Sequence, residues 1–161
     1  MREILFRGQT RRKGEKARMD GSPVESNWVY GGVLCGSGDH SIIYQTEPDV
    51  EKKVVYTDTL GQYTGLIDKN GVKIFEGDIL QGDEYPYCSE GEYNYFAEVV
   101  WFDEGCCGAG LYTHKNPKSI VRGISHGNCE WLEDFDSDKW QVIGNIFDNP
   151  ELIGGETDEQ I

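Results

Sequence analysis

The sequence lacks a long hydrophobic run, because no segment approaches the ~20 consecutive apolar residues that a membrane-spanning helix needs. Its first residues, MREILFR, carry a charge every few positions and contain no apolar stretch of signal-peptide length. Its five cysteines include no C-x-x-C pair, so neither a disulfide framework nor a dithiol redox motif is expected. These absences predict a cytoplasmic protein with reduced thiols and no membrane contact.

Catalytic and cofactor motifs are also missing. The G-x-G fragment at Gly36 and Gly38 lacks the third glycine and the following helix of a dinucleotide site. Cys35 and His40 are close in sequence, but no oxyanion motif accompanies them. We therefore predict a protein that is not an enzyme and that needs no cofactor.

A metal site is the next alternative. Among the cysteines and histidines of the C-terminal half, the candidate ligands are Cys107, His126 and Cys129, and His126 and Cys129 have a plausible ligand spacing. Structural zinc uses two tight pairs of ligands, whereas the first pair here would be the adjacent Cys106 and Cys107, an awkward chelate. The pattern favours separate thiols and histidines, and we predict no bound metal.

Charge is plentiful but unevenly spread. The net charge is −14, yet residues 1–18 hold seven basic residues against two acidic ones, which leaves −19 for the remainder. The acidic remainder opposes binding to nucleic-acid phosphates. Arg11, Arg12 and Lys13 are candidate partner-binding residues, and the partner is an unknown host or phage protein, the body of the same chain or a second copy in a homo-oligomer. Tyr85 and Tyr87, in a second polar loop, are further candidates.

Glycine and aromatic residues indicate a β protein. The chain has 21 glycines and 12% aromatic residues, and YFAEVVWF at 95–102 is its most apolar run. The stretch 59–80 has the pattern of a β-hairpin, with an Asn70-Gly71 turn between two partly apolar runs. Glu76 and Asp78 flank a glycine after this hairpin. Two such carboxylates can bind a cation or act as acid and base, but an E-G-D step more often forms a bulge whose acids accept backbone hydrogen bonds.

Three blocks of sequence resemble the YopX family of phage and prophage proteins. They are GQYTGLIDKNGVKIFEGDIL at 61–80, ILFRG with WVYG near the start, and WQVIGNIFDNPEL at 140–152. The resemblance implies a mostly β fold, a phage origin and therefore a bacterial host. It implies no established activity and supplies no catalytic residues.

Together these patterns predict a mainly β chain with little helix. We expect a small antiparallel β-barrel around the central hairpin, with an accessory N-terminal sheet or lobe. The expected parts are N-terminal strands and a basic loop (1–56), the barrel core (57–153) and a disordered tail (154–161), all in one compact unit. The expected function is a non-catalytic protein-interaction module, and the alternative is a nucleic-acid-associated protein that uses the basic N-terminal segment.

Overall fold

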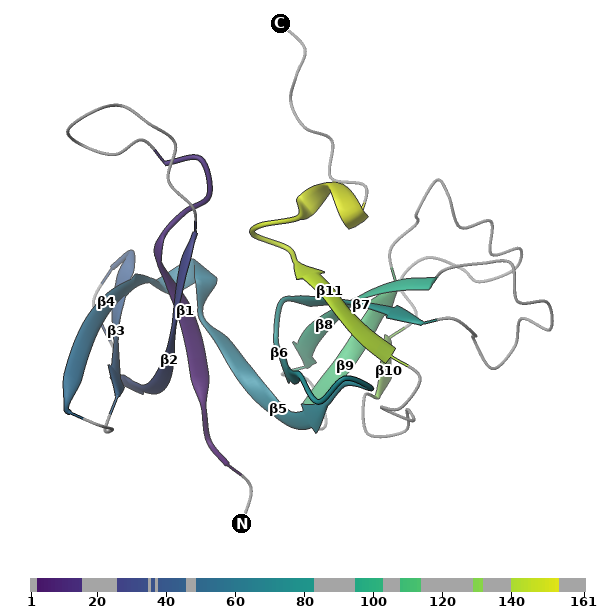
Figure 1. Cartoon of the computed structure of the whole chain (residues 1–161), viewed down its shortest axis with the longest axis horizontal. Coiled ribbons are helices and arrows are strands. Elements are labelled where there is room, and N and C mark those ends of the chain that lie inside the picture. Colours follow the sequence, from purple (N-terminus) through teal and green to yellow (C-terminus); the bar gives the residue numbers. More distant parts are fainter. Residues whose placement is uncertain are drawn as a thin grey trace, which may run out of the picture. The chain divides into compact units, whose positions relative to one another are not determined.

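The computed structural model describes residues 3–15, 26–34, 36, 38–45, 49–82, 95–102, 108–113, 129–131 and 140–153. The predicted sites at Tyr85, Tyr87, Cys107 and His126, and the predicted tail at 154–161, lie outside these residues. The chain divides into two compact units, Met1–Tyr63 and Thr64–Ile161, which Figure 1 shows in one view. The predicted boundary between residues 56 and 57 stays a prediction. The two units of the structure divide between residues 63 and 64, inside a strand.

The first unit contributes four strands to a six-stranded antiparallel sheet, whose order β4-β3-β2-β1 continues with β5 (Gly61–Ile67) and β6 (Lys73–Phe75). The four strands are β1 (Phe6–Arg11), β2 (Asn27–Leu34), β3 (His40–Gln45) and β4 (Glu51–Tyr56), and the short 3-10 helix η1 (Thr57–Thr59) follows them. Among these four strands, neighbours in the sheet are also consecutive in the sequence. The sequence predicts an accessory N-terminal sheet or lobe here, and its separate character stays a prediction because the sheet continues beyond β1.

The core of this unit lies on one face of the sheet. Ile43 on β3 and Val55 on β4 are fully buried, and they share this face with Gly8 on β1. A Cβ atom at Gly8 would lie 2.9 Å from Cγ2 of Val55, so the backbone of β1 packs directly against β4. Because β1 and β4 are separated by two strands in the sheet order, the sheet must curl to bring them together.

The second unit holds a five-stranded antiparallel sheet with the order β10-β9-β8-β7-β11. Its members are β7 (Asp78–Gly82), β8 (Tyr95–Phe102), β9 (Gly108–Thr113), β10 (Cys129–Trp131) and β11 (Trp140–Asn145). The 3-10 helix η4 (Pro150–Ile153) follows β11. The buried apolar side chains of this unit are Ile74, Phe75, Ile79, Leu80, Val99 and Trp140.

The central hairpin consists of β5 (Gly61–Ile67) and β6 (Lys73–Phe75), and β5 begins in the first unit and ends in the second. The amide of Gly71 donates to the carbonyl of Asp68 at 3.0 Å, which closes the turn. Gly71 has a φ of 82°, whereas no described non-glycine residue has a positive φ. The predicted positive-φ corner is therefore confirmed at Gly71 but not at Asn70, as in a type I turn followed by a left-handed glycine.

The predicted fold class is confirmed at the level of a mainly β, antiparallel structure with little helix. Among the described residues, the five-stranded sheet is open, since no pairing joins its end strands β10 and β11. A closed barrel therefore stays a prediction. No helix within the described ranges is long and apolar enough to cross a membrane.

Candidate functional site

The strongest candidate for a functional surface is the face of the N-terminal sheet that points away from its core. Cross-strand partners share a face of a sheet, and side chains alternate along each strand. The registers of β2, β3 and β4 therefore place ten positions on this surface, which we call the outer face. They are Trp28, Tyr30, Gly32 and Leu34 on β2; His40, Ile42 and Tyr44 on β3; and Lys52, Val54 and Tyr56 on β4.

An aliphatic row crosses the outer face. Leu34 pairs with Ile42, and Ile42 pairs with Val54, so the three side chains lie side by side on neighbouring strands. Leu34 is 44% exposed and Val54 is 58% exposed. Single exposed apolar residues are common, but a contiguous row on a sheet marks a surface able to bury area against another molecule.

An aromatic side chain lies flat beside this row. Gly32 pairs with Tyr44 across β2 and β3, and a Cβ atom at Gly32 would lie 2.4 Å from Cζ of Tyr44. Glycine at this position therefore lets the tyrosine ring cover the backbone of β2. Tyr30, on the same strand as Gly32, is 43% exposed. The outer face thus combines aliphatic and aromatic surface.

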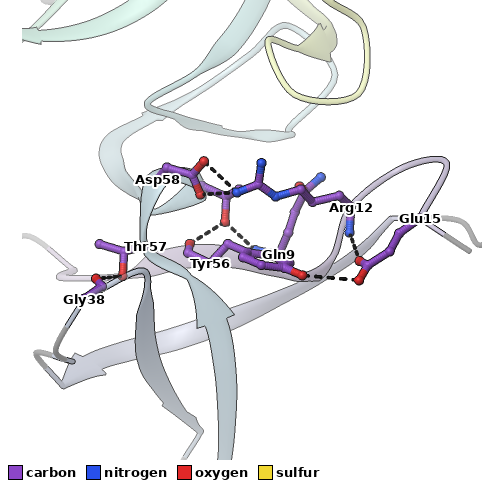
Figure 2. A network of polar contacts seen from close by, with 8 residues as sticks. Gln9, Arg12, Glu15, Gly38, Tyr56, Thr57 and Asp58 are labelled. Atoms are coloured by element: carbon purple, nitrogen blue, oxygen red, sulfur yellow. Dashed lines mark hydrogen bonds and ion pairs between the residues drawn. The ribbon is translucent and has the colours of Figure 1, made fainter. Parts of the chain in front are cut away.

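Arginine 12 lies at the Tyr56 end of the outer face. Its Nη2 atom donates to Oδ1 and Oδ2 of Asp58 at 2.9 and 2.7 Å, and its guanidinium carbon lies 4.4 Å from the centre of the Tyr56 ring. Its backbone amide donates to Oε2 of Glu15 at 3.1 Å, and the hydroxyl of Tyr56 donates to Oε1 of Glu15 at 3.3 Å. Figure 2 shows these contacts converging on the segment that follows β4.

A second set of hydrogen bonds fixes the backbone beneath Arg12. The hydroxyl of Thr59 donates to the carbonyl of Tyr56 at 2.7 Å and accepts from the amide of Gln9 at 2.9 Å, so η1 is tied to β1 (Figure 2). Thr59 and Gln9 are both 1% exposed. The hydroxyl of Thr57 donates to the carbonyl of Gly38 at 3.4 Å. Asp58 is therefore presented to Arg12 by a rigid turn.

These contacts place the predicted partner-binding cations. Arg12 is engaged within its own unit by Asp58, Glu15 and Tyr56. Arg11 and Lys13 are exposed on either side of it. Together Arg11, Arg12 and Lys13 form what we call the basic arm. Whether the arm also contacts a partner stays a prediction, since the structure holds one chain.

The central hairpin carries a buried carboxylate whose role is structural. Oδ1 of Asp68 accepts from the amides of Asn70 and Val72 at 2.8 and 2.9 Å, and Oδ2 accepts from the amide of Val142 at 2.9 Å. Burial by itself raises the pKa of this carboxyl group. The three backbone donors outweigh that effect and hold the pKa of Asp68 below its ordinary value of 3.8. Asp68 therefore joins the hairpin turn to β11.

The E-G-D step after the hairpin is a tight turn between β6 and β7. Oδ2 of Asp78 accepts from the amide of Phe75 at 2.8 Å, and Asp78 is 1% exposed. Gly77 has a φ of 81°, and its amide donates to the carbonyl of Val99 at 2.8 Å. This arrangement supports the interpretation of Asp78 as an acceptor for backbone amides rather than a cation ligand.

The described residues contain no group of three or more His, Cys, Asp or Glu side chains able to hold a metal ion. Two of the candidate ligands, Cys107 and His126, lie outside the described residues. For Cys129 the structure gives the backbone, which pairs with Tyr112 in β9. The expectation of no metal thus stays a prediction.

Sequence reasoning did not identify the outer face. Its signal is the alternation of Trp28, Tyr30 and Leu34 in NWVYGGVL, but the intervening Val29 and Val33 are also apolar. A strand that is apolar on both faces does not reveal which face is exposed. The registers of β2 with β3 and β3 with β4 resolve the question.

A comparison with protein families agrees with the blocks of sequence. A family model described as YopX protein matches residues 26–154. Because the match covers most of the chain, this protein belongs to the YopX family, and the resemblance read from the sequence is confirmed. The chain is also similar to the crystal structure of protein EF1440 from Enterococcus faecalis, with 22% sequence identity, coverage of 95% of this chain and 99% of that chain, and a TM-score of 0.47. No curated protein matches the chain.

Proposed function

We propose that this YopX-family chain is a non-catalytic accessory protein of a phage or prophage, and that its outer face binds a host or phage protein in the bacterial cytoplasm. The observation that carries the proposal is the aliphatic row of Leu34, Ile42 and Val54, which leaves Leu34 44% and Val54 58% exposed. Fully burying a side chain of this size stabilises an interface by roughly 1.5–3 kcal/mol. The exposed parts of Leu34 and Val54 therefore offer apolar area that an interface can bury.

The use of carboxylates in the C-terminal unit supports a non-catalytic role. Asp68 and Asp78 are its buried described carboxylates, and both accept hydrogen bonds from backbone amides of turns. A general acid or base must reach a substrate proton. Side chains whose oxygens are held by amides at 2.8 Å serve the turns instead.

The nucleic-acid alternative depends on the basic arm, and its central arginine is already paired. Arg12 stacks on Tyr56 and donates to Asp58, so contact with a phosphate requires breaking an existing ion pair. The net charge of −14 adds repulsion at longer range. Both observations favour a protein partner.

The test is affinity purification of the tagged full chain from a lysogenic or infected bacterial host. We expect one protein to be captured in stoichiometric amount by the parent chain and lost with the double variant Leu34→Ser/Val54→Ser. The matched control is Val72→Ser, because Val72 is similarly exposed (47%) but lies in the turn of the central hairpin. Circular dichroism confirms that all variants fold.

Three results contradict the proposal. One is equal capture by the parent and the double variant, and another is the absence of any captured protein. The third is binding to DNA or RNA with a steep log–log salt slope that falls when the basic arm is removed, since that result establishes the nucleic-acid alternative. Sedimentation of the purified chain checks whether the captured partner is a second copy.

A further inference from the structure

The outer face differs in charge from the rest of the chain. Its ten positions include one lysine and one histidine but no aspartate or glutamate. The chain as a whole has 29 acidic residues against 15 basic ones. A surface without carboxylates is therefore unusual for this protein, and it coincides with the aliphatic row.

Both ends of the outer face carry a guanidinium group stacked on an aromatic ring. The guanidinium carbon of Arg7 lies 4.6 Å from the centre of the Trp28 ring, and that of Arg12 lies 4.4 Å from the centre of the Tyr56 ring. At the Tyr56 end, Asp58 and Glu15 offset part of the charge of Arg12 and its neighbours. An anionic group that approaches this face therefore meets less repulsion than elsewhere on the chain.

Lys52 places a positive charge close to the exposed aliphatic side chain of Val54. Lys52 and Val54 are two residues apart on β4 and lie on the same face, which separates their Cα atoms by about 6.6–6.8 Å. Both side chains are exposed. When a bound segment buries an aliphatic side chain against Val54, a carboxylate about two residues further along the extended segment can reach the ammonium group of Lys52.

We propose that the outer face binds a protein segment in which aliphatic side chains and carboxylates are interspersed. This inference rests on the proposed function. The aliphatic side chains pack on the row of Leu34, Ile42 and Val54, and a carboxylate pairs with Lys52. Single-stranded nucleic acid is the less suitable occupant, because the net charge of −14 repels its phosphates.

The test uses a display library of random peptides selected against the full chain at low salt. We expect the selected peptides to be enriched in aliphatic residues and in Asp or Glu. For a selected peptide measured by calorimetry, Lys52→Glu and Val54→Ser should each weaken binding at least tenfold. The effect of Lys52→Glu should shrink at high salt, because screening removes most of a surface charge interaction.

Lys53→Glu is the matched control for the charge. Lys53 is next to Lys52 on β4 but points to the opposite face, where its Nζ atom lies 3.2 Å from Oε2 of Glu51. Val72→Ser is the control for the apolar contact, since Val72 is 47% exposed and lies in the turn of the central hairpin. Both control variants should bind the peptide as the parent does.

The outcomes separate this inference from the proposed function. Peptides that depend on Val54 but show no acidic enrichment and no effect of Lys52→Glu overturn the acidic partner and leave the interaction surface standing. Failure to select any peptide that depends on Val54 overturns both. An oligothymidine that competes with the selected peptides for the face also overturns the inference, in favour of a nucleic-acid occupant.

Discussion

The two units of this chain use their carboxylates differently. In the N-terminal unit, Asp58 is 60% exposed at its side chain and pairs with Arg12, which is 49% exposed. In the C-terminal unit, Asp68 is buried and each of its oxygens accepts from backbone amides. An exposed ion pair contributes little to stability, whereas a buried acceptor that satisfies several amides cannot be removed without leaving those amides unpaired.

Asp68 holds part of the fold together, whereas the pair of Asp58 with Arg12 lies beside the surface that we propose for recognition. Asp68 and Asp78 both lie in the block of family resemblance at 61–80, and Asp68 joins this block to the block at 140–152 through Val142. The N-terminal unit exposes Leu34 and Val54 on its outer face and carries Arg12 beside Tyr56 (Figure 2). Asp68 therefore secures the C-terminal unit, whereas the surface that we propose for recognition lies in the N-terminal unit.

The largest effect is expected from Asp68→Ala. Removing this carboxylate leaves the amides of Asn70, Val72 and Val142 without their acceptor, and each such amide costs roughly 1 kcal/mol or more. We expect a loss on the order of 3 kcal/mol in the free energy of unfolding by urea denaturation. Asp58→Ala is the control from the other unit and should change stability by about 1 kcal/mol or less. Equal losses in the two variants contradict the comparison.

A smaller effect is expected from Gly71→Val. Gly71 has a φ of 82° and open space where a side chain would stand, so the cost is conformational and not steric contact with neighbours. A β-branched residue in the left-handed region should cost on the order of 1–2 kcal/mol. Gly71→Asn is the control, because asparagine tolerates this conformation better. A melting temperature unchanged by Gly71→Val rules out the turn.

The hairpin and its turn could be predicted because their signals are local. Asn70-Gly71 marks the corner in sequence, and the apolar runs on both sides mark the strands. The contact between Asp68 and Val142 could not be predicted in this way, since 74 residues separate the two in the chain. The pairing of Arg12 with Asp58 spans 46 residues and could not be predicted either. Sequence reasoning identified the basic arm but could not choose between its own chain and a partner.

The pH dependence of stability should reveal the contribution of the ionised Asp68 carboxylate. The folded pKa of Asp68 is held below 3.8, so its ionised form contributes stability that is fully present above about pH 3.8 and lost as the pH falls through the folded value. We expect the difference in unfolding free energy between the parent and Asp68→Asn to shrink on acidification from about pH 6 to pH 3. A difference that stays constant over this range contradicts the role of the ionised carboxylate.

The smallest effect concerns the ion pair at the outer face. Arg12 and Asp58 are both about half exposed, so their attraction is screened by solvent and salt. A double-mutant cycle with Arg12→Ser and Asp58→Asn should give a coupling of about 0.5–1 kcal/mol at low salt. The coupling should fall toward zero at high salt, while the fold of every variant stays intact.

The coupling isolates the contact because the cycle subtracts the loss of stacking on Tyr56 that Arg12→Ser causes alone. Zero coupling at low salt means that the pair does not hold the basic arm to its own unit. Arg12 is then able to contact a partner, and the proposed recognition surface extends beyond the outer face.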